Sequence, residues 1–126
     1  MMPTSCSIRT RSVKRGELYL IIPLRGDPRR SRVYLVVSRQ GFVDTPYSTL
    51  VGVPVYSRGE GLTTEVPVGP EHGLKHTSFV RCDEVTSIPR ERMQRFVGAL
   101  SEEKMRNVNR ALAVALDIDP DDLASL

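Results

Sequence analysis

The stretch Val-Tyr-Leu-Val-Val at residues 33–37 decides the fold class, because it is apolar at every position and lies between the polar residues Arg32 and Ser38. A strand with one face in water alternates apolar and polar residues, whereas a strand covered on both faces is continuously apolar. β-Branched and aromatic residues also favour the extended conformation. We therefore expect residues 33–37 to form a strand with both faces covered.

Similar runs lie on both sides of this strand along the chain. Leu-Tyr-Leu-Ile-Ile at 18–22 is continuously apolar and stops at Pro23. Thr-Leu-Val-Gly-Val-Pro-Val-Tyr at 49–56 is expected to bulge or to reach a sheet edge at Pro54, because proline has no N–H to donate to a ladder. The remaining expected strands are 63–68, 77–85 and a short sixth at 94–97.

After Ser101 the hydrophobic period becomes that of a helix. Ser101 is the expected N-cap, and the acids Glu102 and Glu103 suit the first turn of a helix dipole. One apolar stripe follows at helical spacing: Met105, Val108, Leu112, Ala115 and Leu116. Asp119-Pro120 is expected to end the helix. Five or six short strands and one C-terminal helix share a core by curling into a small barrel or half-barrel, so the sequence predicts an α+β, mainly β domain.

Length and composition exclude several classes of protein. The 126 residues are enough for one domain, and 40% hydrophobic with 26% charged residues is ordinary for a globular chain. No apolar stretch approaches the ~18–20 residues of a membrane span, and no apolar run follows the basic N-terminus as a secretory signal requires. Two cysteines make no disulfide framework. We expect a cytoplasmic protein without a membrane partner.

Charge is distributed unevenly along the chain, although the net charge is only +3. Residues 1–15 hold four bases and no acid, whereas residues 117–126 hold four acids and no base. We expect a flexible basic tail at 1–13, a folded domain at 14–118 and a short acidic tail at 119–126.

The loop at residues 25–32 is the first candidate for chemistry. It carries four arginines and one acid, Asp27, within eight residues: Arg25, Arg29, Arg30 and Arg32. Guanidinium groups are planar bidentate donors that suit phosphate, so the loop predicts an anion site. A solvated hairpin loop is the alternative.

The tripeptide Arg81-Cys82-Asp83 is the second candidate. In a strand, alternation places Arg81 and Asp83 on one face, about 7 Å apart, and turns Cys82 toward the core. An acid beside an arginine can serve as general base and charge clamp in phosphoryl chemistry. An ordinary ion pair on one face is the alternative.

Other candidates are weaker. Tyr56 and Ser57 offer hydroxyls beside Arg58, but no Gly-x-Ser-x-Gly elbow surrounds Ser57. The Gly-rich segment 58–61 lacks the ending of a P-loop. The candidate zinc ligands match no finger spacing: Cys6, His72, His76 and Cys82. We expect neither a metal ion nor another cofactor.

Taken in order, these pieces resemble the MazF/PemK/Kid toxin family. The similarity begins at Lys-Arg-Gly-Glu-Leu-Tyr (14–19), which looks like the family's opening strand, and continues through Arg32 and Val-Val-Ser (36–38). Further similar segments are 51–57, 64–68, 73–74, 80–83, 86–88 and 97–101. The resemblance covers residues 14–118 and includes a C-terminal helix of the family type.

The resemblance implies a small SH3-like barrel of the CcdB/Kid type, a homodimer and a type II toxin that inhibits translation and growth. It implies a metal-independent endoribonuclease that cuts single-stranded RNA at short sequences. In this family the ribose 2′-hydroxyl attacks the adjacent phosphate and leaves a 2′,3′-cyclic phosphate and a 5′-hydroxyl. A MazE-type antitoxin with a disordered, acidic segment is the implied partner.

The family's functional residues can be carried over by position. Arg32 matches the arginine that stabilises the developing charge, and Arg81 with Asp83 matches the Kid-type acid and base. Ser57 is the hydroxyl nearest to the family's Thr/Ser position, which strict register gives to Tyr56. Val33 stands where the family has proline. The residues expected to contact RNA are Arg25, Arg29, Arg30, Tyr56 and Arg58.

Two further interpretations stay open at this stage. A CcdB-like toxin that binds gyrase would share the barrel without needing Arg32, Arg81 and Asp83. An inactive SH3-like binding module is the other.

Aromatic side chains often stack on single-stranded bases, and three stand in or near candidate loops: Phe42, Tyr47 and Tyr56.

Overall fold

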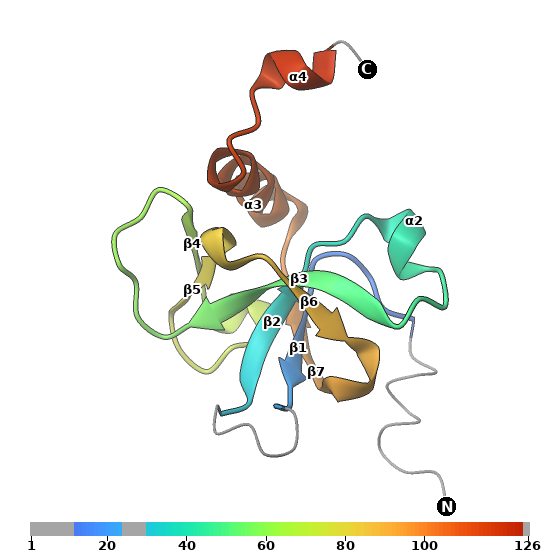
Figure 1. The fold of residues 1–126 in the computed structure, drawn as a ribbon. Coiled ribbons are helices and arrows are strands. Elements are labelled where there is room, and N and C mark those ends of the chain that lie inside the picture. The colour runs from blue at the N-terminus through green and yellow to red at the C-terminus, as the bar shows by residue number, and fades with distance from the viewer. Residues whose placement is uncertain (1–11, 24–29, 125–126) are drawn as a thin grey trace, which may run out of the picture.

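The computed structural model describes residues 12–23 and 30–124, which form one curved antiparallel sheet with a helix across it (Figure 1). The strands are β1 Glu17–Ile21, β2 Arg32–Val36, β3 Thr49–Tyr56, β4 Glu65–Val68, β5 Ser78–Arg81, β6 Thr86–Pro89 and β7 Met93–Ala99. The α-helices are α2 Gln40–Val43, α3 Glu102–Ala115 and α4 Pro120–Ala124, and the 3-10 turns are η1 Pro70–His72, η2 Cys82–Glu84 and η3 Arg90–Arg92. The order is β4-β5-β3-β2-β1-β7, with β6 also on β3, which confirms the expected mainly β class.

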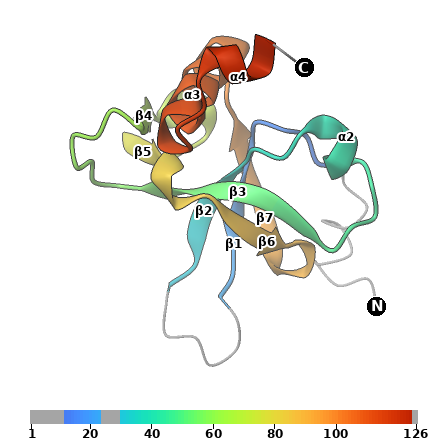
Figure 2. The same cartoon turned by 45° about the horizontal axis from the view of Figure 1, so that its top comes forward.

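Strand β3 organises the sheet because it has two successive partners along one edge. Its first half pairs with β6, from Thr49↔Pro89 to Gly52↔Thr86, and its end pairs with β5 at Val55 and Tyr56. Pro54 lies in the interval between these two partners, so its missing N–H is accommodated as the sequence predicts. This change of partner bends the sheet toward a half-barrel (Figure 2).

Two hydrophobic clusters lie on opposite faces of the curved sheet. Leu18, Leu35 and Val80 are fully buried in the cluster that α3 covers with Val108 and Ala111. Their chain neighbours on β1 and β2 enter the second cluster: Tyr19 and Val36 pack there with Leu50, Ile88 and Met93. Leu35 and Val36 therefore have the covered faces expected for this strand, whereas Val33, Tyr34 and Val37 are only half-buried.

The 3-10 turn η1 packs against β7 without strand pairing and holds two distant segments together. A Cβ on Gly98 would lie 1.9 Å from the carbonyl oxygen of His72, so only glycine fits there. Gly73 has φ +97°, and a Cβ on it would lie 2.3 Å from the carbonyl oxygen of Val97. This contact keeps the loop after η1 in place beside β7.

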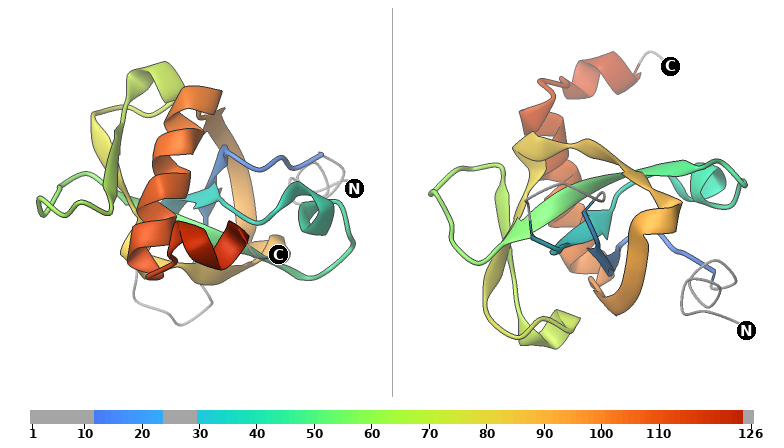
Figure 3. Two further views of the ribbon diagram at one scale, coloured as in Figure 1. Left: turned by 90° about the horizontal axis from the view of Figure 1, so that it is seen from above. Right: turned by 60° about the horizontal axis from the view of Figure 1, so that its bottom comes forward.

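Helix α3 begins as expected, because the Ser101 hydroxyl accepts a hydrogen bond from the Lys104 N–H at 3.1 Å. It ends earlier than expected, at Ala115. Pro120 starts the short helix α4 instead of ending α3, since proline suits the first turn of a helix. Figure 3 shows α3 crossing the sheet and α4 following it. Within the described residues, no helix has both the length and the apolar character to cross a membrane.

The expected strand at 77–85 is confirmed only over β5, Ser78–Arg81, because the chain turns at Cys82. Strand β5 ends at Arg81, η2 follows, and β6 begins at Thr86. Cys82 is fully buried, and its N–H donates to the Thr64 carbonyl at 3.2 Å, which continues the β4–β5 register by one residue before the chain turns through η2.

Candidate active site

A groove of about 480 Å³ opens where β2 begins and β3 ends. It is lined by Ile21, Pro23, Arg30, Arg32, Tyr34, Pro54, Tyr56, Glu84, Val85, Thr86 and Arg92. Three of these side chains are arginines and one is a carboxylate. The lining thus has an excess of positive charge, and Tyr34 and Tyr56 give it aromatic walls.

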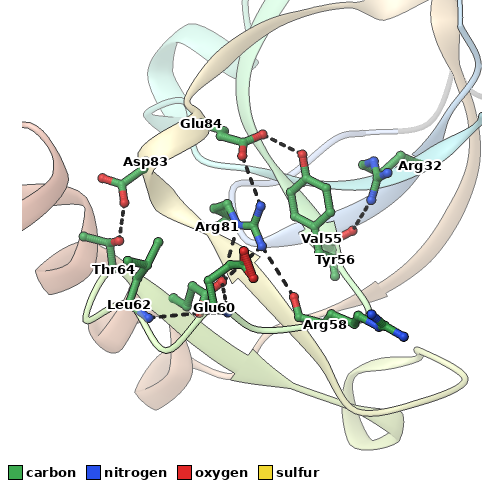
Figure 4. Close-up of polar contacts among 11 residues, drawn as sticks. Arg32, Val55, Tyr56, Arg58, Glu60, Leu62, Thr64, Arg81, Asp83 and Glu84 are labelled. Carbon is green, nitrogen blue, oxygen red and sulfur yellow. Dashed lines mark hydrogen bonds and ion pairs between the residues drawn. The ribbon is translucent and has the colours of Figure 1, made fainter. Parts of the chain in front are cut away.

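Tyr56 lies between two guanidinium groups at the centre of this site. The guanidinium carbons of Arg32 and Arg81 are each 4.1 Å from the centre of its ring, and Figure 4 shows them on either side of it. Arg32 also donates from Nη1 to the Val55 carbonyl at 3.3 Å. Cations over an aromatic face are attracted to its π electrons, so the ring keeps both arginines in position.

The hydroxyl of Tyr56 donates to Glu84 Oε1 at 2.5 Å. Burial raises the pKa of Tyr56, and the hydrogen bond and charge of Glu84 raise it further. Arg32 and Arg81 act in the opposite direction, because a cation favours the phenolate, but they do not cancel the increase. Tyr56 therefore stays neutral near neutral pH and donates to the Glu84 side chain.

Arg81 bridges two carboxylates. Its Nε and Nη2 donate to Glu65 Oε2 at 3.3 and 3.2 Å, and its Nη1 donates to Glu84 Oε2 at 3.3 Å. Burial alone would lower the pKa of Arg81, but Glu84 and Glu65 outweigh it and raise that pKa. Only 18% of the Arg81 side chain is exposed, so its position is well fixed.

Glu65 ties the loop after β3 to Arg81. Only 4% of its side chain is exposed, and its carboxylate accepts from the N–H groups of Glu60 and Leu62 as well as from Arg81 (Figure 4). Burial tends to raise the pKa of Glu65, but these donors prevail and hold the pKa below its ordinary value. The Arg58 carbonyl, in the same loop, accepts from Arg81 Nη2 at 3.5 Å.

Asp83 does not share a face with Arg81, because the chain has already left the strand. Its Oδ2 accepts a hydrogen bond from the Thr64 hydroxyl, on the side away from Tyr56 (Figure 4). Glu84, one residue later in η2, takes the place beside Arg81 where alternation puts Asp83. The expected Arg81–Asp83 arrangement is therefore corrected to Arg81–Glu84.

Only some of the other expected site residues line the groove in the structure. Arg30 lines the groove, whereas Ser57 and Arg58 are exposed residues just beyond Tyr56 and do not line it. Arg25 and Arg29 lie outside the described residues, as does Cys6. Phe42 and Tyr47 pair with each other, ring centres 5.0 Å apart, and stand apart from the groove lining.

Two of the four candidate metal ligands, His72 and Cys82, lie in the protein interior. The His72 imidazole is buried, and its Nδ1 accepts from the Gly69 N–H at 3.3 Å. Burial, and then the charge of Asp83, raises the pKa of the Cys82 thiol to about 11, so it stays protonated. Among the residues that the structure describes, no group of three or more His, Cys, Asp or Glu side chains could hold a metal ion.

Glu84, Glu65 and Arg92 belong to the site but were missed by the sequence reasoning. Glu84 lies next to Asp83 in the sequence. It reaches Arg81 because the strand ends before it, and the alternation of apolar and polar residues gives no sign of that end. Glu65 reaches Arg81 because the two residues are register partners across β4 and β5, and strand pairing is not visible in a single sequence. Arg92 follows Pro89 in a turn and reaches the groove through η3.

Comparison with known proteins decides the family. A family model described as "PemK-like, MazF-like toxin of type II toxin-antitoxin system" matches residues 14–116. The chain belongs to the PemK/MazF family. Endoribonuclease MazF3 of Mycobacterium tuberculosis is 34% identical over 91 residues, which are 71% of this PemK/MazF chain and 86% of the relative.

Solved structures of PemK/MazF toxins have the same fold. The Mycobacterium tuberculosis toxin MazF-mt6 superimposes with a TM-score of 0.72 at 27% identity, over 82% of this chain and 98% of that one. A mycobacterial endoribonuclease in complex with its cognate antitoxin gives a TM-score of 0.72 at 23% identity, over 87% and 98%. A MazE–MazF complex of Deinococcus radiodurans gives 0.70 at 21% identity, over 86% and 99%.

Proposed function

We propose that this MazF-type toxin endoribonuclease cuts single-stranded RNA in the groove at Tyr56, without a metal ion, by attack of a ribose 2′-hydroxyl on the adjacent phosphate. The observation that carries the proposal is the pair of guanidinium groups, each 4.1 Å from one phenol ring whose hydroxyl binds a carboxylate. An internal nucleophile requires charge stabilisation and proton transfer, and this arrangement has groups for both.

Arg32 and Arg81 are the proposed charge stabilisers. In the transition state the non-bridging oxygens of the phosphate gain negative charge, and preorganised cations bind that state more strongly than the ground state. Glu65 and Tyr56 hold the guanidinium of Arg81 in place before the substrate arrives. Arg30 and Arg92, which line the same groove, are proposed to contact flanking phosphates.

Glu84 is the proposed base and Tyr56 the proposed acid. Glu84 takes the proton of the 2′-hydroxyl, O2′ bonds to phosphorus, the P–O5′ bond breaks, and Tyr56 gives its proton to O5′. Protonation of Glu84 removes the charge that raises the pKa of Tyr56 and leaves both guanidinium groups to stabilise the phenolate. The existing hydrogen bond then returns the proton from Glu84 to Tyr56 and restores the resting state.

The remaining expected residues have other proposed roles. Asp83 anchors η2 to Thr64 and so sets the position of Glu84. Arg58 and Ser57 lie on the loop that Glu65 holds, and we propose that they contact RNA beyond the groove, as do Arg25 and Arg29. We propose that residues 14–118 form the catalytic domain.

The partners follow from family membership and surface chemistry. We propose a MazE-type antitoxin, since solved relatives are complexes with cognate antitoxins, and a cytoplasmic site of action, where messenger RNA is translated. We also propose a homodimer. Its support is an apolar hollow of about 450 Å³ between α2 and α3, to which Val85, Leu112 and Leu116 contribute.

The test is to incubate purified, antitoxin-free protein with a long RNA in EDTA and to map the new ends. We expect cuts within one short sequence, each leaving a 5′-hydroxyl and a 2′,3′-cyclic phosphate. Intact RNA in the presence of folded protein contradicts the proposal. Ends that carry a 5′-phosphate contradict the internal nucleophile.

A further inference from the structure

A second hollow, of about 270 Å³, adjoins the catalytic groove and shares Arg32 with it. Lys75, His76 and Arg95 line the hollow with Arg32, and no carboxylate is among its lining residues. The groove at Tyr56 contains Glu84, so the second hollow has the less compensated positive charge of the two. A strand of RNA that passes Arg32 meets it directly.

Two cations of this hollow, Lys75 and Arg95, are free to bind a ligand. Lys75 and Arg95 are exposed, and neither makes a hydrogen bond or an ion pair with another described residue. Arg81 and Arg90 differ from them, because glutamates hold the first and the carbonyls of Val43, Thr45 and Tyr47 hold the second. Cations without protein partners suit anions from solution.

The hollow is also built on fixed backbone. The close approach of Gly98 to the His72 carbonyl and of Gly73 to the Val97 carbonyl locks the loop after η1 against β7. The Ser78 hydroxyl donates to the His76 carbonyl at 3.1 Å and fixes the other end of the loop. The backbone at Lys75 is therefore held beside β7, the strand that carries Arg95.

The floor of the hollow is apolar. Val33 on β2 and Arg95 on β7 are both register partners of Leu20 on β1. They therefore lie on the same face of these three adjacent strands. Val55 and Val97 complete the floor. A cationic rim over an apolar floor suits a nucleotide, in which a charged phosphate is joined to a sugar and a base with apolar faces.

We propose that this hollow is a second RNA subsite, in which Lys75 and Arg95 bind backbone phosphates of nucleotides that flank the cut. The proposal rests on the proposed function, because Arg32 joins the hollow to the groove where cleavage takes place. An acidic peptide is the competing occupant. Continuity with the groove through Arg32 favours the substrate, which must extend beyond its scissile phosphate in both directions.

The experiment uses two RNA oligonucleotides that contain the mapped cleavage sequence, one minimal and one extended on both sides. We expect kcat/KM of the wild type to be higher for the extended RNA. In K75A/R95A the advantage of the extended RNA is lost, mainly through KM. The plot of log kcat/KM against log salt becomes shallower by about 1.4, because each phosphate contact on a single strand contributes about 0.7 to its slope.

The matched control is Arg106→Ala, which removes an exposed arginine of α3 outside the hollow and is expected to keep the wild-type length effect and salt slope. If the wild type cleaves RNA but K75A/R95A keeps both the length effect and the salt slope, the subsite is overturned and the proposed function stands. The same is true if the variant loses only antitoxin binding, which assigns the hollow to the peptide. If the wild type cuts neither oligonucleotide, the proposed function itself fails.

Discussion

Tyr56 lies at the centre of the candidate site, with a carboxylate on its hydroxyl and a guanidinium on each side of its ring. The carboxylate of Glu84 raises the pKa of Tyr56, and the two arginines oppose it. We therefore predict that Glu84→Gln lowers this pKa, since the amide removes the negative charge while the cations remain. The ultraviolet absorbance of the tyrosinate ion, followed against pH, measures the pKa of Tyr56. Adding Tyr56→Phe to the wild type and to Glu84→Gln identifies the part of the signal that comes from Tyr56. An unchanged or higher pKa contradicts the coupling.

Arg81 is predicted to tolerate no replacement, not even by lysine. A lysine ammonium can keep one ion pair, but it lacks the planar fork that contacts Glu65, Glu84 and Tyr56 together. Loss of one preorganised charge donor typically costs about 10²-fold in kcat or more. We expect Arg81→Lys to show a loss of this size in single-turnover cleavage. Arg106→Lys is the control, and a rise in KM at unchanged kcat for Arg81→Lys contradicts the assignment.

At this scale the sequence predicts the two arginines that meet at Tyr56, but not the carboxylate that lies beside Arg81. Arg32 and Arg81 are identified from their residue types and from the family resemblance, and the structure brings both to Tyr56. Asp83 was expected in place of Glu84 because period-two alternation was carried through Cys82. The strand ends at Arg81 and η2 follows, and the alternating pattern of the sequence does not show that turn.

Among the elements, the loop between β3 and β4 depends on a single carboxylate. The donors around Glu65 hold its pKa below the ordinary value of 4.5. Its contribution to folding stability is therefore complete above that pH and is lost as pH falls through the lower folded-state pKa. We predict that urea unfolding separates wild type from Glu65→Gln at neutral pH and that the difference shrinks below about pH 4.5. A stability difference between wild type and Glu65→Gln that grows as the pH falls contradicts a lowered pKa of Glu65.

The contact between η1 and β7 predicts a second effect at the level of elements. Gly98→Ala places a methyl group 1.9 Å from the His72 carbonyl oxygen, so η1 must separate from β7. We expect a loss of about 2 kcal/mol or more in the free energy of unfolding. Gly41→Ala in α2 is the control, because its Cβ meets only the Arg39 side chain at 3.5 Å. Equal stability of the two variants in thermal unfolding contradicts the contact.

Elements were predicted best where apolar residues are continuous. The runs at 18–22, 33–37 and 49–56 correspond to β1, β2 and β3 within one or two residues. The helix α2 was missed because its four residues are too few to show a period. The sequence predicts that Pro120 ends a helix, whereas in the structure it begins α4. Proline is common both just after a helix and in the first turn of one, so the residue alone does not distinguish the two positions.

For the whole molecule, the apolar hollow between α2 and α3 predicts self-association. Leu116 lines this hollow and is 55% exposed in the single chain. We expect Leu116→Asp to convert a dimer into a folded monomer, because the substitution places a charge in an apolar interface but disturbs no core. Light scattering after gel filtration measures the mass. Leu123→Asp, at a residue 59% exposed on α4, is the control, and a dimer that survives Leu116→Asp contradicts this interface.

Glu84 has a further consequence for what the toxin recognises. Its carboxylate already occupies one edge of Arg81, 3.3 Å from Nη1, as a tethered counter-ion. An incoming anion must displace it, and a tethered group competes at a high effective concentration. A chloride or free phosphate ion offers one contact for this exchange, whereas a polynucleotide engages several arginines at once. The proposed RNA site is therefore expected to favour a ligand that makes several contacts at once over small free anions.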